Sequence, residues 1–150
     1  MNTETFILGD KEFTCVQMNV FAANKLIQRI LKVVLPLLGS VAGSKNVLDM
    51  DIKDAAILLS EQLDEKLMET IVLPLLSDAR VYSVTDKKFV KDSISIDQVF
   101  TIETLFNFYE LVWSVGRYQF APFFGQIMNR FGVALGVESP KEISENLPTV

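Results

Sequence analysis

The first residues in this sequence whose types and spacing could support chemistry are acidic. They share one face of a predicted helix, where 61, 65 and 69 are each four positions apart: Glu61, Asp64, Glu65 and Glu69. Carboxylates that converge at close range are the ligands that Mg²⁺ prefers. A catalytic site of this kind needs a second acidic cluster opposite, and neither Asp51 with Asp54 nor Glu103 with Glu110 has a compelling spacing. We interpret the acidic residues as a solvated helix face and expect no bound metal.

Nucleophilic catalysis finds little support in the sequence. The chain has no histidine, which removes the commonest general base and excludes Ser-His-Asp and Cys-His catalysis. Its one cysteine, Cys15, stands in an apolar, strand-like run and is expected to be a small buried residue. The stretch GSVAGSK at 39–45 lacks the spacing of a phosphate-binding loop and follows a helix rather than a strand. We therefore predict a protein that is not an enzyme, with no catalytic residues and no cofactor.

Length and composition favour one globular domain. Of the 150 residues, 49% are hydrophobic and 22% charged, which is typical of a chain with a substantial core. The net charge of −5 repels a phosphate backbone, so no nucleic-acid partner is expected. The longest apolar stretch, 31–42, is interrupted by Lys32, Pro36 and Gly39, and it is shorter than the ~20 residues that span a bilayer. With no visible signal peptide, we expect a cytoplasmic protein without a membrane partner.

Two β-hairpins and two amphipathic helices are predicted in the first two thirds of the chain. The hairpins lie at 5–16, which turns at Gly9, and at 79–92. A helix at 20–35, capped by Asn19, has a basic outer face, and a helix from Asp51 to about residue 71 has an acidic one.

The phrase LPLL occurs at the end of both helical patterns, at 35–38 and 73–76. Proline lacks the N–H that closes the helical ladder and disfavours helical backbone in the preceding residue. We therefore expect a helix end or a kink near Leu35 and near Leu73. The leucines that follow each proline are expected to turn back onto the core.

A third long helix is predicted at 102–120, with Asp97 or Thr101 as its cap. Its polar residues share one face: Glu103, Asn107, Glu110, Ser114 and Arg117. The remaining apolar arc covers roughly 220°, whereas a surface helix needs little more than ~100°. This helix is therefore either central to the domain or partly covered by a partner. Pro122 is expected to break it, and a second short helix is expected to follow.

These elements predict an α+β, mostly α fold with three or four main helices and two short β-hairpins. Residues 1–137 are expected to form a single helical domain, and 138–150 a flexible polar tail. The aromatic and methionine residues near the end of the domain are the predicted partner-binding surface: Trp113, Phe120, Phe123, Phe124, Met128 and Phe131. The alternative is that the same residues fill the core.

The order of these elements resembles the phage tail assembly chaperones of long-tailed phages and prophages. Those proteins open with a β segment similar to FILGDKEFTCV and continue with a strand pair similar to VYSV and KKFV. An acidic-aromatic element similar to IDQVF follows, and then a long apolar helix that closes in phenylalanines, similar to YQFAPFF. This chain has Thr101 where the family has glycine, and Gln119 where the family has asparagine.

The resemblance implies a non-enzymatic role in phage tail and virion assembly, in the host cytoplasm during infection or prophage induction. Such chaperones coat the apolar, helical tape-measure protein and keep it soluble until tail tube protein subunits surround it. The composition is compatible with this role, because Phe and Met adapt to varied helical partners and net negative charge favours solubility.

Two other functions stay open at this point. The first is a structural or self-associating adaptor subunit of a phage particle, in which the apolar face of the helix at 102–120 pairs with its own kind in a homo-oligomer. The second is an Mg²⁺-dependent nucleotide pyrophosphohydrolase, because the acidic face at 61–69 is similar to the metal-binding helices of those enzymes.

Overall fold

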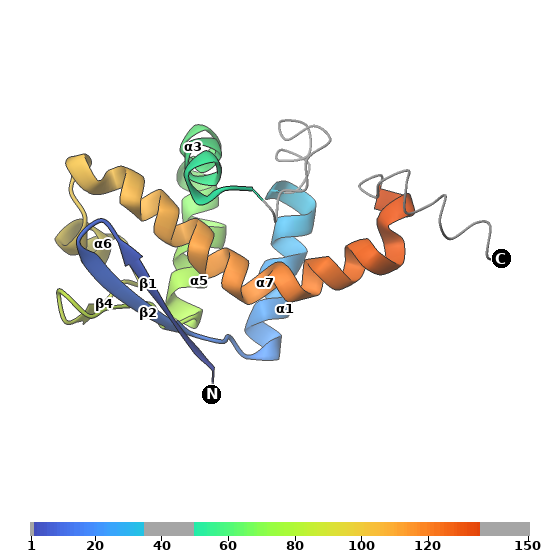
Figure 1. Cartoon of the computed structure of the whole chain (residues 1–150), viewed down its shortest axis with the longest axis horizontal. Helices are drawn as coiled ribbons and strands as arrows, with labels where there is room; N and C mark the ends of the chain where they lie inside the picture. The colour runs from blue at the N-terminus through green and yellow to red at the C-terminus, as the bar shows by residue number, and fades with distance from the viewer. Residues whose placement is uncertain (1, 35–49, 136–150) are drawn as a thin grey trace.

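The computed structural model of the protein describes residues 2–34 and 50–135, and for 33–34 and 127–135 it describes the backbone alone. Within these residues the fold is α+β and mostly helical, with one antiparallel sheet (Figure 1). This confirms the predicted fold class. The predicted tail at 138–150 lies outside the described residues, so the boundary of the domain stays a prediction.

The sheet contains both predicted hairpins. Its strands are β1 (Thr3–Leu8), β2 (Lys11–Val16), β3 (Tyr82–Ser83) and β4 (Lys88–Phe89), in the order β1-β2-β3-β4. The first hairpin turns at Gly9, whose φ of 64° is a conformation that favours glycine. Sequence reasoning did not predict that β2 pairs with β3, which joins the two hairpins into one sheet.

Helix α1 (Val20–Arg29) begins where it was predicted. The side chain of Asn19 accepts a hydrogen bond from the Ala22 N–H at 2.8 Å, as an N-cap residue does. The helix continues as a π-helical turn, η1 (Ile30–Val34). The first LPLL phrase, at 35–38, lies outside the described residues.

The predicted second helix is two helices, which corrects the expectation of one continuous element. Helix α3 (Ile52–Gln62) is capped by Asp51 as expected, but it ends before Leu63. Asp64 then caps a new helix, because its carboxylate accepts the Leu67 N–H at 2.8 Å and so favours a helix start over continuation. That helix runs through α4 (Glu65–Leu67), the π-helical turn η3 (Met68–Val72) and α5 (Leu73–Asp78).

Pro74 of the second LPLL phrase stands in the first turn of α5, directly after the π-helical turn. The helix therefore changes its hydrogen-bond pattern at Leu73 and ends at Asp78, while Leu75 and Leu76 are buried as predicted. Proline also leaves the carbonyl four residues earlier without its helical donor. That carbonyl belongs to Thr70, and it accepts a hydrogen bond of 2.6 Å from the Arg29 guanidinium of α1.

A short helix that was not predicted, α6 (Ser93–Val99), precedes the long one. Asp92 caps it in a reciprocal arrangement with Ser95. Asp97 lies inside α6 and is not a cap. Thr101, the other predicted candidate, precedes the 3-10 turn η4 (Ile102–Thr104) and forms a capping box with Thr104.

Helix α7 (Leu105–Leu135) runs through Pro122 without a break, which corrects the prediction of two helices. An interior proline costs a helix about 3 kcal/mol. Packing on both sides of Pro122 opposes that cost, because Phe120 is buried and Phe123 and Phe124 pack against the core.

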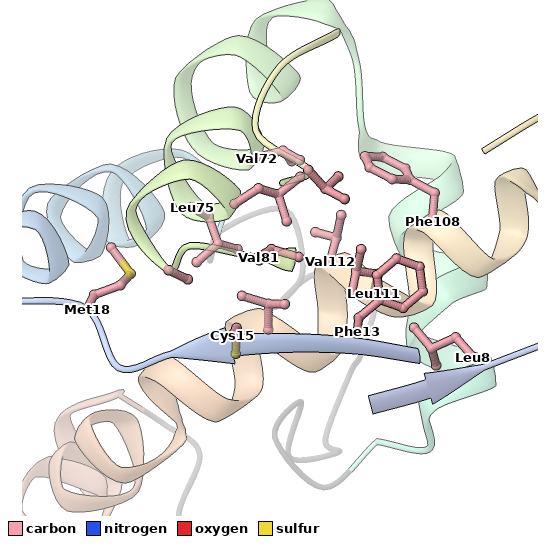
Figure 2. Close-up of a cluster of buried hydrophobic side chains, with 14 of the residues drawn as sticks. Leu8, Phe13, Cys15, Met18, Val72, Leu75, Val81, Phe108, Leu111 and Val112 are labelled. Carbon is pink, nitrogen blue, oxygen red and sulfur yellow. The ribbon is translucent and has the colours of Figure 1, made fainter. Parts of the chain in front are cut away.

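The core lies between α7, the sheet and α5, so α7 is central, as one of the two predictions had it. Phe108, Leu111 and Val115 of α7 are almost fully buried. Figure 2 shows side chains of α7 meeting Phe13 of β2 and Leu75 of α5. The Phe100 ring lies 5.6 Å from that of Phe13 and 5.4 Å from that of Phe108, measured between centroids.

Candidate partner-binding surface

The predicted aromatic surface near the end of α7 contributes to the core in its described part. Phe120 is 5% exposed, and Trp113, Phe123 and Phe124 are half-buried. The rings of Phe123 and Phe124 pack edge to face at 5.2 Å. The side chains of Met128 and Phe131 lie outside the described residues. The partner-binding role of this cluster therefore stays a prediction.

Gln119, in the same stretch, has a structural role that sequence reasoning did not assign. Its Oε1 accepts a hydrogen bond from the Met18 N–H at 2.9 Å, and its Nε2 donates to the Val16 carbonyl at 2.7 Å. One side chain of α7 therefore binds the backbone at two points between β2 and α1. The amide fits this place because it is at once a donor and an acceptor.

The polar stripe of α7 is covered by α3 at its centre. Glu110 is only 5% exposed, and it accepts a hydrogen bond of 2.8 Å from Asn107. Lys53 of α3 places its Nζ 3.6 Å from the other carboxylate oxygen. Ala55 and Ala56 of α3 are fully buried, and α3 is the element that packs most extensively against α7.

Because α3 covers the polar stripe, apolar side chains of the first turn of α7 and of the preceding 3-10 turn η4 face solvent. Ile102 is 92% exposed, and Leu105 and Phe106 are exposed as well. We name these three residues with Glu103 the α7 start patch. No part of this patch was among the predicted site residues, since the composition of a helix does not say which side a neighbour covers.

A second exposed apolar group lies at the beginning of α1. Phe21 is 89% exposed and Val20 is 81% exposed. Lys25 of α1 and Lys32 of η1 are also exposed. We name Val20, Phe21, Lys25, Gln28 and Lys32 the α1 face. The basic outer side of this helix was predicted, but the exposed phenylalanine within it was not.

The acidic residues at 61–69 do not form a joint site. Glu61 lies in the last turn of α3, Asp64 caps the next helix, and Glu65 and Glu69 follow on that helix; all four are exposed. In the part of the chain that the structure describes, no three acidic or cysteine side chains gather at metal-binding distances.

Cys15 is buried, as expected. Burial, helped by the negative charge of Glu4, raises the pKa of its thiol to about 11. The thiol is therefore protonated near neutral pH, in the form that is a poor nucleophile.

The described residues thus form a small, mostly helical α+β protein with solvent-exposed apolar side chains. Within 2–34 and 50–135, no helix has the length and hydropathy that crossing a membrane requires. The sequence model of the phage tail assembly chaperone proteins matches residues 9–132, and the chain belongs to that family. Comparisons with curated proteins and with solved structures give no match.

The family assigns the protein to phage tail assembly, with tail proteins as the general class of partner. It also suggests a role without catalysis. The match covers the turn and second strand of the first hairpin, the whole second hairpin and most of α7, and these belong to the elements on which the sequence resemblance was based.

Proposed function

We propose that this protein binds the tape-measure protein of a phage tail in the host cytoplasm and keeps it soluble until tail tube subunits replace it. Membership of the tail assembly chaperone family supports this proposal. The observation that carries it is the exposure of large apolar side chains, of which Phe21 and Ile102 are the most exposed. A chaperone for an apolar helical client must keep such side chains accessible.

The proposal is tested by co-expression of tape-measure fragments with this protein. We expect the fragments to stay in the soluble fraction and to elute with the chaperone. The control is co-expression with an unrelated acidic protein of similar size, which should leave the fragments insoluble. If the fragments precipitate equally in both cases, the proposal is wrong.

We also propose that the cluster near the end of α7 takes part in client binding. Met128→Ser and Phe131→Ser should then lower the amount of co-eluting fragment without lowering the thermal stability of the chaperone. Gln126→Ser, an exposed exchange on the same helix, is the control. Full retention of the client by both serine variants would contradict this part of the proposal and leave the chaperone role intact.

A further inference from the structure

The α1 face combines exposed apolar groups with positive charge. Phe21, Lys25 and Gln28 follow at spacings of four and three residues, so they lie on one side of α1, and Lys32 follows four residues later in the π-helical turn η1. All four residues are exposed to solvent, and Phe21 is 89% exposed. The sequence of α1 contains no acidic residue.

The α7 start patch combines exposed apolar groups with negative charge. Ile102 of the 3-10 turn η4 precedes Leu105 and Phe106 of α7 by three and four residues, which brings the three side chains close together at the start of the helix. Glu103 is exposed within the patch. The turn of the first hairpin lies beside it, since a Cβ on Gly9 would come 3.4 Å from the Asn107 side chain, and this turn adds the exposed carboxylate of Asp10.

We infer that the α1 face of one copy of this protein docks on the α7 start patch of a second copy. Each surface is apolar at its centre, and the charges of the two surfaces are opposite, which favours their pairing over the pairing of either surface with itself. Within one chain they lie apart, since α7 starts at one end of the molecule while α1 lies beside the later part of α7 (Figure 1). The α1 face and the α7 start patch of one molecule therefore do not contact each other.

A contact between two different surfaces leaves one α1 face and one α7 start patch unused in every pair. Association of this kind is heterologous and continues to a line or a closed ring. Each surface has few residues, so we expect the contact to be smaller than the ~1,200 Å² of stable complexes and to be transient. Salt weakens it, because exposed charges contribute to it. This inference does not depend on the identity of the client.

The test is analytical ultracentrifugation of the full chain and of two variants. Phe21→Asp disables the α1 face, and Ile102→Lys disables the α7 start patch. The wild-type protein should show a mass that rises with concentration and falls with added salt. Each variant alone should stay monomeric, with association weakened at least about tenfold. An equimolar mixture should form a one-to-one dimer and nothing larger, because each variant retains the surface that the other lacks.

Ile94 offers a matched control position, because it is 69% exposed in the first turn of α6 and belongs to neither surface. Ile94→Asp and Ile94→Lys should associate as the wild type does. A wild type that stays monomeric at all concentrations would overturn the inference, and so would a variant that dimerises alone.

The client assay on the wild-type protein, set beside its mass in solution, separates this inference from the proposed function. Tape-measure fragments that stay soluble with a wild type that remains monomeric support the chaperone role and overturn self-association. Fragments that precipitate beside a protein that self-associates as described refute the chaperone role alone.

Discussion

The two hydrogen bonds of Gln119 lead to the most direct prediction from the structure. Gln119→Ala removes the acceptor of the Met18 N–H and the donor to the Val16 carbonyl at once. An ordinary hydrogen bond contributes about 0.5–1.5 kcal/mol, and a buried group left without its partner costs about 1–3 kcal/mol. Gln119 and Val16 are half-buried and Met18 is buried, so water replaces part of the loss. We expect the free energy of unfolding to fall by about 2–3 kcal/mol.

The effect is measurable by urea and thermal unfolding, followed by circular dichroism and by the fluorescence of the one tryptophan, Trp113. For a chain of this size the expected loss lowers the Tm by roughly 4–12 °C. Gln119→Glu keeps the acceptor for Met18 but places a carboxylate oxygen against the Val16 carbonyl. It should therefore be at least as destabilising as alanine at neutral pH.

Gln126→Ala is the control, because Gln126 is exposed on the same helix and makes no hydrogen bond in the described residues. It should change the free energy of unfolding by less than about 0.5 kcal/mol. If Gln119→Ala is as mild as Gln126→Ala, the two contacts do not hold the segment between β2 and α1, and the reasoning fails.

Three further predictions concern other polar groups. Partial burial of Asp86 opposes its ionisation, but hydrogen bonds from Ser83 and Lys11 outweigh that effect and lower its pKa. The ionised carboxylate therefore stabilises the fold above the ordinary pKa of 3.8, and this stabilisation is lost as pH falls through the lowered pKa. Asp86→Asn should therefore unfold more easily than the wild type at neutral pH, and the difference should vanish in acid unfolding curves. Burial raises the pKa of the Cys15 thiol from 9.0 to about 11, so this thiol should resist iodoacetamide in the folded protein and react with it in urea. Its contribution to the free energy of unfolding should decline as pH rises from 9.0 to about 11. Equal rates of alkylation in the folded and the unfolded protein would contradict its burial. Arg29→Met removes the donor to the Thr70 carbonyl and should lower the free energy of unfolding by about 1–3 kcal/mol. The control Lys25→Met changes an exposed residue of the same helix and should leave the free energy of unfolding unchanged. Equal losses for the two variants in chemical unfolding would refute the role of Arg29 as the donor to this carbonyl.

Predictions that depend only on residues close together in the sequence were confirmed by the structure. Asn19 and Asp51 cap their helices, and Gly9 turns the first hairpin. Each of these features forms between residues that are at most a few positions apart. The contacts between their side chains and backbone form independently of distant segments of the chain.

Where two local signals compete, the prediction from the sequence was wrong. Asp64 was read as part of an acidic helix face, but it caps a new helix. Asp92 and Ser95 form a capping box that opens α6, which the apolar periodicity did not reveal. Pro122 was expected to end a helix that packing of the surrounding phenylalanines continues.

By itself, the sequence determined the α+β class, both hairpins, most helix starts and the resemblance to a family that the comparison confirmed. Only the tertiary structure decided that β2 joins β3, that Gln119 holds the backbone near Met18, and that α3 covers Glu110 while Phe21 and Ile102 face solvent. The physical reason is distance along the chain. Periodicity shows that a helix has an apolar or a polar side, but the partner that covers each side comes from a distant segment, and exposure is a property of the packed pair.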